Sequence, residues 1–376
     1  MKVPAAAYRP DGSPGPGALH EVQLDVAAIG ESTVTMRGIL VADVRGGAGL
    51  DQRDGDLRFH PAGGGGPLAS PHDRREARAF GIVNVAYQLH RGLDYLTPLI
   101  GHALPVLTAR IGVHENQIPA WGGGHYRLPA SAYSSLPEMT PPAVTGEIHL
   151  GPGSTFAEAA GRRYFAAAAH VAAIVLHELG HHVTRHTADF RLNGRRPPLA
   201  QTNHKTPLDE GTADYIAAIL LQTADIYGWH RGRTPPSAQA RRRLDGPWTM
   251  AAFRGSHRTD PHLDGTVWAA ALWSAREAVR ATGAEPAEFD RLVAEGLVSI
   301  GATDPEMPLE EACRRRRSFG RALEAILGAD AAHGGRFGEL IAAAFARRGI
   351  ETGFSNAELR DRCRALLPRP TAAANR

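Results

Sequence analysis

The chain of 376 residues holds only two cysteines, Cys313 and Cys363. Two thiols can pair with each other but cannot make a disulfide framework, and neither lies in a metal-binding motif. No apolar run reaches the roughly 18 residues of a membrane-spanning helix. Residues 1–10 lack the apolar segment of a signal peptide. We therefore expect no membrane span, and a cytoplasmic protein if the chain is complete or a secreted one if it is a trimmed mature form.

The excess of positive charge is small, because 42 lysine and arginine residues stand against 39 aspartate and glutamate residues. The densest basic cluster, Arg314–Arg317, lies in a helical pattern and has no aromatic residue between its arginines. This cluster predicts a solvated helix face and no nucleic-acid partner. We see no clustered acidic loop that would bind calcium and no internal repeat. With 43% hydrophobic residues, the chain can bury one or two substantial cores.

Histidine is plentiful, and two of the 18 histidines stand four residues apart in the motif His177-Glu178-Leu179-Gly180-His181. On a helix, residues i and i+4 lie one above the other, so the two imidazoles can converge on one cation. Neutral imidazole is a good zinc ligand, and the carboxylate of Glu178 can take a proton from a water that the metal activates. The motif therefore predicts a zinc hydrolase.

The residues before the motif favour this interpretation. Residues 171–176 are Val-Ala-Ala-Ile-Val-Leu, so the motif continues a buried helix. Burying two histidines beside a glutamate is costly without a compensating partner, and a metal supplies one. Two neighbouring histidines are not expected to bind it. His170 is two turns, roughly 10 Å, away, and His182 points about 100° round the helix, which favours packing or exposure.

A catalytic zinc normally takes three protein ligands and leaves the fourth position to water. Residues 206–209, Thr-Pro-Leu-Asp, predict the start of a helix, with threonine as N-cap and proline at the first position. Glu210 and Asp214 stand four residues apart on that helix. One carboxylate can bind the metal while the other accepts a hydrogen bond from a ligating imidazole. The alternative is a pair of surface acids near a helix N-terminus, where negative charge is favoured.

These motifs resemble those of the thermolysin-like and fungalysin-like zinc metallopeptidases, the gluzincins. Residues 177–184 look like the active-site helix of that family, and residues 209–214 are similar to its second motif. The resemblance implies three zinc ligands, His177, His181 and Glu210. It also implies that Glu178 is the general base and that Asp214 orients a ligating imidazole by a hydrogen bond to its free N–H.

A third segment, residues 260–273, is similar to the fungalysin stretch in which a histidine precedes a helix that bears glycine and tryptophan. The resemblance implies that His262 stabilises the negative charge that develops on the attacked carbonyl oxygen. A fixed N–H donor can lower the energy of that charge by a few kcal/mol. Two alternatives stay open: His262 is an exposed loop histidine, or His257 has this role.

The chain departs from the family pattern between His181 and Glu210, where the connection is longer than in the compact thermolysin-like members. We expect this loop to rim the cleft. The loop contains no tyrosine that could assist the oxyanion histidine. That role is therefore absent or filled from elsewhere, and Tyr215 is a conceivable substitute. The loop carries Arg191, Arg195, Arg196, Pro197, Pro198 and Lys205.

Hydrophobic periodicity predicts the order of the elements. Strand-like runs at 22–26 and 33–36 and the linker 63–67 indicate a β-rich start, and residues 74–96 are helical in pattern. The run 146–150 is where we expect the sheet edge that borders the cleft, along which a peptide could add as an extra strand. Further helices are expected near 266–281, 286–298, 308–327, 335–348 and 356–366.

The sequence thus predicts an α+β fold, a zincin-like two-lobed metallopeptidase with a mixed α/β N-terminal lobe and an α-helical C-terminal lobe. We expect a β-rich segment over 1–72, a catalytic lobe over 73–190, and a helical lobe over 191–376 that holds the third ligand and the oxyanion histidine. The predicted function is a Zn²⁺-dependent metalloendopeptidase that acts on a peptide or protein. The alternatives are a zinc hydrolase of a small amide or ester and a catalytically weak peptide-binding protein on the same scaffold. Specificity, propeptide processing, oligomeric state and cysteine pairing stay open.

Overall fold

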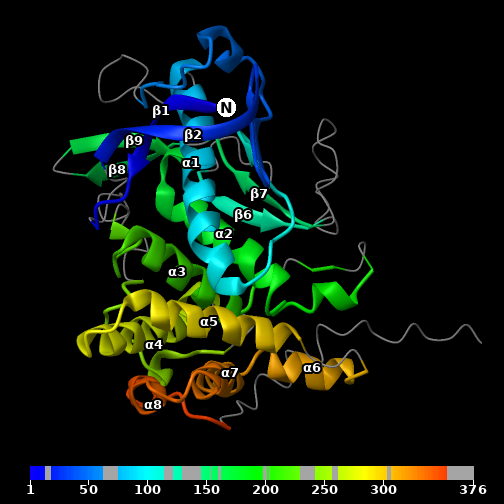
Figure 1. Ribbon diagram of the computed structural model, residues 1–376, viewed down its shortest axis with the longest axis vertical. Coiled ribbons are helices and arrows are strands. Elements are labelled where there is room, and N and C mark those ends of the chain that lie inside the picture. The colour runs from blue at the N-terminus through cyan, green and yellow to red at the C-terminus, as the bar shows by residue number, and fades with distance from the viewer. Residues whose placement is uncertain are drawn as a thin grey trace, which may run out of the picture. The chain divides into compact units, whose positions relative to one another are not determined.

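The protein has a mixed β-sheet in its N-terminal region and a mostly helical C-terminal region (Figure 1). This confirms the predicted α+β class. The computed structural model describes residues 1–12, 18–61, 75–113, 122–128, 145–152, 154–159, 162–197, 201–202, 204–228, 242–255, 261–302 and 306–353. The predicted linker 63–67, the expected helix 356–366, His257 and Cys363 lie outside these residues.

The described part of the chain forms a seven-stranded sheet in the order β1-β2-β3-β4-β5-β7-β6. Strands β1 to β4 run antiparallel, β4, β5 and β7 are parallel, and β6 returns antiparallel to β7. A separate antiparallel pair joins β8 and β9. The bounds are β1 (Lys2–Arg9), β2 (Ala18–Gly30), β3 (Thr33–Met36), β4 (Ile39–Asp43), β5 (Leu107–Ile111), β6 (Gly124–Arg127), β7 (Glu147–Leu150), β8 (Ser154–Ala159) and β9 (Arg162–Ala167).

Two of these strands follow from the predicted runs, and one does not. The run 33–36 is β3, and the run 22–26 lies inside β2. Strand β1 was not predicted, because it contains Pro4 and three successive alanines, which are poor strand formers. Pairing with β2 along its whole length, from Lys2 opposite Asp25 to Arg9 opposite Ala18, makes it a strand.

The expected edge of the sheet was wrong. Strand β7, which covers most of the run 146–150, pairs with β5 on one side and with β6 on the other. All four residues of β7 are buried, as an inner strand requires. The last strand of the described sheet is β6. Its sequence, Gly-His-Tyr-Arg, has no alternation of apolar residues that would reveal a strand.

The helices agree well with the predicted periodicity, and α1, α4, α5 and α8 correspond to predicted helices with ends that differ by a few residues. No helix among the described residues is long and apolar enough to cross a bilayer. The helices are α1 (Arg75–Ile100), α2 (Ala172–His186), α3 (Pro207–Leu221), α4 (Pro261–Ala281), α5 (Pro286–Gly301), α6 (Leu309–Arg315), α7 (Phe319–Ala332) and α8 (Gly338–Ala346), with short 3-10 turns η1 (Leu50–Arg53), η4 (Ala168–His170), η5 (Asn193–Arg195) and η9 (Met250–Ala252).

The single helix expected over 308–327 is two helices, α6 and α7. The chain breaks because Arg316 and Arg317 turn inward and are buried. The guanidinium of Arg316 donates hydrogen bonds to the carbonyl oxygens of Ala188, at 2.8 Å, and Gly301, at 3.1 Å. Ser318 then caps the new helix, since its side chain accepts a hydrogen bond from a backbone N–H of the first turn.

The expectation that Arg314–Arg317 form a solvated face is therefore half right. Arg314 and Arg315 are exposed and form ion pairs with Glu310 and Glu311. Surface pairs of this kind contribute little to stability. The other two arginines of the run are buried, and the guanidinium of Arg316 donates to backbone carbonyl oxygens instead.

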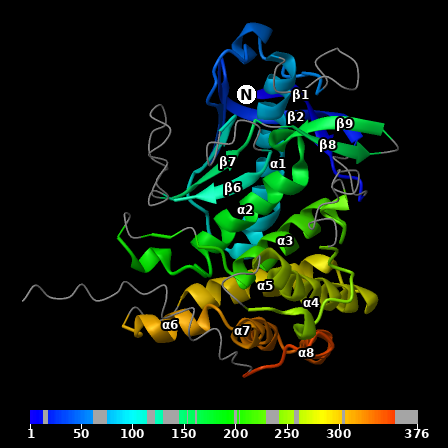
Figure 2. The ribbon, with the colours of Figure 1, turned by 180° about the vertical axis from the view of Figure 1, so that it is seen from behind.

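Contacts divide the chain into two compact units. The first comprises Met1–Val183, Arg196–Asn203 and Ala213–Gly246, and the second comprises Thr184–Arg195, His204–Thr212 and Pro247–Arg376. In the first unit, α1 packs on β1, β3, β4 and β5. In the second, α4 packs on α5 and α8, and α7 packs on the same two helices (Figure 2). Trp268 fills the core of this helical group, with its ring 5.2 Å from that of Phe345.

His170 provides a test of the packing around α1. It is buried, its Nε2 lies 2.8 Å from the carbonyl oxygen of Ala77, and its ring meets the ring of Phe80 edge-on. Burial lowers the pKa of His170 to about 4, although the hydrogen bond to Ala77 opposes this effect. The unfolded chain takes up a proton at this residue near pH 6.5, and the folded chain does so only near pH 4.

We expect the free energy of unfolding to fall as the pH drops from 6.5 to 4, by up to about 1.4 kcal/mol per pH unit from this residue. His170→Gln keeps an N–H donor but does not titrate, so its stability should depend less on pH in this window. Urea unfolding of both proteins between pH 4.5 and 7.5 measures the difference. Parallel pH profiles for the two proteins would contradict the burial of a neutral imidazole.

Candidate metal centre

Helix α2 presents two histidines from the predicted motif on one face. His177 and His181 are both buried, their rings are 4.7 Å apart, and their Nε2 atoms face each other at 3.1 Å. Two nitrogens bound to one tetrahedral zinc lie roughly 3.3 Å apart, given bonds of about 2.0–2.1 Å. The observed separation therefore suits two ligands of a single ion.

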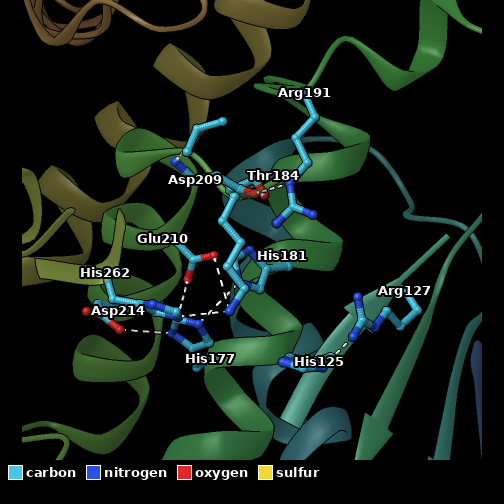
Figure 3. A network of polar contacts seen from close by, with 12 residues as sticks. His125, Arg127, His177, His181, Thr184, Arg191, Asp209, Glu210, Asp214 and His262 are labelled. Atoms are coloured by element: carbon cyan, nitrogen blue, oxygen red, sulfur yellow. Dashed lines mark hydrogen bonds and ion pairs between the residues drawn. The ribbon is translucent and has the colours of Figure 1, made fainter. Parts of the chain in front are cut away.

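Helix α3 supplies the carboxylate. It begins at Pro207, as predicted, and the side chain of Thr206 accepts a hydrogen bond from the backbone N–H of Asp209. The next residue, Glu210, has no exposed surface. Ligand atoms of His177, His181 and Glu210 all lie within 4.8 Å of one another, and Figure 3 shows the Glu210 carboxylate turned toward the two rings. These three buried residues form a candidate metal site, as the sequence predicted.

The backbones of α2 and α3 approach closely at Gly180, the residue before the second histidine. A Cβ atom placed on Gly180 would lie only 2.6 Å from Cα of Ala213 and 2.9 Å from its Cβ. A glycine facing an alanine is therefore what lets these helices meet with so little space between them. This contact lies one residue from His181 and three residues from Glu210.

Asp209 makes a second connection, between the start of α3 and the end of α2. Its carboxylate accepts a hydrogen bond from the hydroxyl of Thr184 at 2.6 Å and pairs with the guanidinium of Arg191 at 2.6 Å. Arg191 is buried and therefore stabilises this connection instead of lying at the surface. Arg195, from the same loop, donates to the carbonyl oxygen of Met307 at 2.8 Å.

Asp214, one turn after Glu210, lies on the far side of His177. Its Oδ1 is 2.9 Å from Nδ1 of His177 and accepts a hydrogen bond from the hydroxyl of Tyr227 at 2.9 Å. Its Oδ2 accepts one from the guanidinium of Arg242. Burial alone would raise the pKa of Asp214, but the charge of Arg242 and the hydrogen bond from His177 hold it below its usual value. Neither Tyr227 nor Arg242 lies in a sequence motif, so their contacts with Asp214 could not be predicted from the sequence.

Glu178 lies where the end strand of the sheet passes α2. A Cβ atom placed on Gly124 of β6 would lie 2.9 Å from Cγ and 3.0 Å from Oε1 of Glu178. Only a residue without a side chain allows the strand to run this close to the carboxylate. Glu178 is buried, and the backbone of β6 passes beside its carboxylate.

His262 was expected before a helix and is instead its second residue, because α4 begins at Pro261. Its Nε2 lies 3.0 Å from Oε2 of Glu210 and 3.2 Å from Nζ of Lys205. Lys205 also approaches Oε1 of Glu210, at 4.0 Å, and its side chain is 34% exposed. The sequence placed Lys205 only in the loop, and no local pattern indicated that its ammonium reaches the candidate ligand.

The two neighbouring histidines that we did not expect to bind metal have other partners. His170 donates toward a backbone carbonyl of α1, as described above. His182 is fully buried, with Nδ1 3.1 Å from the hydroxyl of Tyr126 and Nε2 3.2 Å from the carbonyl oxygen of Pro105. Packing, rather than ligation, is therefore its role. Tyr215 is buried in α3, and a part for it in the chemistry stays untested.

No model of a known protein family matches this chain, and no curated protein matches it either. The resemblance to gluzincins therefore depends on the motifs and on the arrangement of His177, His181 and Glu210.

Gly180→Ala tests the close contact between α2 and α3. The new Cβ should force the helices apart, at a cost of about 1–3 kcal/mol for overpacking, partly offset by a gain of about 1 kcal/mol in helix propensity. We expect a lower midpoint of thermal unfolding and weaker zinc binding, because Glu210 moves with α3. Gly328→Ala in α7 is the control, since nothing lies within 4 Å of its added Cβ; it should leave stability equal or higher. Equal stability and zinc affinity in the Gly180 variant would contradict the contact.

Proposed function

We propose that the protein is a zinc metallopeptidase that holds Zn²⁺ with His177, His181 and Glu210. The observation that carries this proposal is the buried group of two imidazoles and one carboxylate on α2 and α3. Two nitrogens and one oxygen are a common donor set for catalytic zinc, and three protein ligands leave one position open. Thiolates, which select structural zinc and other soft-metal sites, take no part in this group.

Zinc in such a site supplies a Lewis acid, which lowers the pKa of a water molecule and polarises a carbonyl group. The chain's own residues do the rest. Glu178 follows His177 directly, and its carboxylate takes the proton of the attacking water and later delivers it to the leaving amine. The Asp214 carboxylate accepts a hydrogen bond from Nδ1–H of His177, so that Nε2 of the neutral ring carries the lone pair that would bind the ion.

We propose that His262 donates to the negative charge on the carbonyl oxygen. Its position 3.0 Å from the Glu210 carboxylate supports this role, because it lies directly beside a proposed ligand. Lys205 contacts the same imidazole, so its side chain is a further N–H donor at this place. A fixed donor at this place acts on charge that develops only during the reaction, so it raises the rate rather than the affinity for substrate.

A peptide substrate is favoured over a small amide or ester by the position of β6. The last strand of the described sheet runs against Glu178 at Gly124, so an extended peptide lying along this end of the sheet has its main chain beside the proposed base.

We extend the proposal to the two-lobed zincin-like fold, with segments 1–72, 73–190 and 191–376. Cleavage of denatured protein, with inhibition by chelators, tests the peptidase activity. Hydrolysis of small amides alone would overturn the peptide substrate but leave the metal site intact.

Glu178→Gln should keep zinc and lose hydrolysis, because glutamine has the same shape but cannot accept the proton. A loss of about 10²-fold or more in kcat is expected for a missing general base. Zinc content after dialysis and turnover of a peptide library measure the two effects. Glu310→Gln, at an exposed residue on α6, is the matched control. Full activity in the Glu178 variant would be fatal to the mechanism.

Glu210→Ala should weaken zinc binding sharply, because it removes one of three ligands. Glu210→Gln is the isosteric comparison, since it keeps the volume of the side chain and loses the charge. Competition with a chelating dye measures the dissociation constants of both variants and of the unchanged protein. If both variants retain zinc as tightly as the unchanged protein, Glu210 is not a ligand.

A further inference from the structure

Behind the proposed zinc ligand His177, a set of buried hydrogen bonds converges on Asp214. A carboxylate group can accept about four hydrogen bonds. Among the residues that the structure describes, three donors surround Asp214: Nδ1 of His177 at 2.9 Å, the hydroxyl of Tyr227 at 2.9 Å, and the guanidinium of Arg242. Asp214 has no exposed surface, and Arg242 is 2% exposed.

Arg242 and Tyr227 also hold each other. The guanidinium carbon of Arg242 lies 4.4 Å from the centre of the Tyr227 ring, within the range of a cation–π contact. The arginine therefore approaches Asp214 from a position that the tyrosine ring supports. Two donors that are themselves packed together leave the carboxylate little freedom to rotate.

We propose that Arg242 and Tyr227 are positioning residues that lock Asp214 and thereby set which nitrogen of His177 faces the metal. This inference rests on the proposed function only in taking His177 as a ligand. An anionic carboxylate only accepts hydrogen bonds, so its contact with His177 requires a proton on Nδ1. The lone pair of the neutral ring then lies on Nε2, the atom that faces Nε2 of His181 at 3.1 Å.

The arrangement also explains how a carboxylate can be buried behind a cationic centre. Asp214 and Arg242 are opposite charges in direct contact, so the pair adds no net charge to the surroundings of the site. If Arg242 is removed, Asp214 becomes a buried anion whose remaining hydrogen bonds within the described part of the chain come from His177 and Tyr227. Breaking a buried pair in this way is strongly unfavourable, and the carboxylate loses its fixed direction toward the imidazole.

The neighbouring residue provides a matched control. The side chain of Arg243 is 48% exposed and pairs with Asp245 at 2.7 Å and with Asp225 at 3.6 Å. Arg243→Met therefore removes the same kind of side chain one residue away without touching Asp214. Arg242→Met removes the buried guanidinium, Arg242→Lys keeps a charge without the planar fork, and Tyr227→Phe removes a single oxygen atom.

The experiment uses the full chain and has three readouts. Competition with a chelating dye gives the Zn²⁺ affinity, and visible absorption reports the coordination of the Co²⁺ form. ¹⁵N NMR shows whether Nδ1 or Nε2 of His177 carries the proton. Losing a residue behind a metal ligand typically weakens metal binding by about 10–100-fold, and we expect this for Arg242→Met. We expect partial rescue in Arg242→Lys, a loss of about tenfold in Tyr227→Phe, and no more than about a twofold change in Arg243→Met. The tautomer of His177 should become mixed in the first variant.

If the unchanged protein binds zinc and both Arg242→Met and Tyr227→Phe bind it as tightly, with the same tautomer, the inference is overturned and the proposed function stands. If Arg242→Met does not fold, Tyr227→Phe decides by the same readouts, because it keeps the ring that supports the arginine. A failure of the unchanged protein to bind Zn²⁺ or Co²⁺ would overturn the proposed function and this inference together.

Discussion

Buried charge around α2 and α3 is the constraint on which the rest of the site depends. Glu210 and Asp214 both lack exposed surface, and ionised carboxylates are stable there only with compensating partners. Asp214 has Arg242 and an imidazole, and Glu210 lies beside Lys205 and His262. The two carboxylates stand one turn apart on one helix. Arg242 balances the charge of Asp214, and the proposed divalent ion would balance the charge of Glu210 in the same way.

This balance requires that the helices lie close and stay fixed. The contact of Gly180 with Ala213 brings the backbones of α2 and α3 together, and Asp209 ties the two helices again through Thr184. Side chains mounted on rigid helices hold ligand geometry better than side chains on loops. The position of Gly124 next to Glu178 brings the sheet equally close to α2, because a glycine lets the backbone of β6 pass beside the proposed base.

Much of the fold was visible in local patterns, and the failures have a common cause. The start of α3 and the strand at 33–36 were predicted because capping residues and alternation are local signals. Strand β1, the end strand β6 and the break after α6 were missed. Each of them depends on a distant partner: β2 for the first, β7 for the second, and the carbonyl oxygens that Arg316 reaches for the third.

The sequence by itself determined the spacing of His177 and His181 and of Glu210 and Asp214, because the period of a helix places residues i and i+4 on one face. It also predicted that residues of the two helices together form one metal site. Only the tertiary structure decided that Glu210 lies near the two imidazoles. It also decided that Tyr227 and Arg242 contact Asp214 and that Lys205 approaches Glu210. Contacts between residues far apart in the chain depend on how helices pack, and no periodicity or motif within a single segment encodes that.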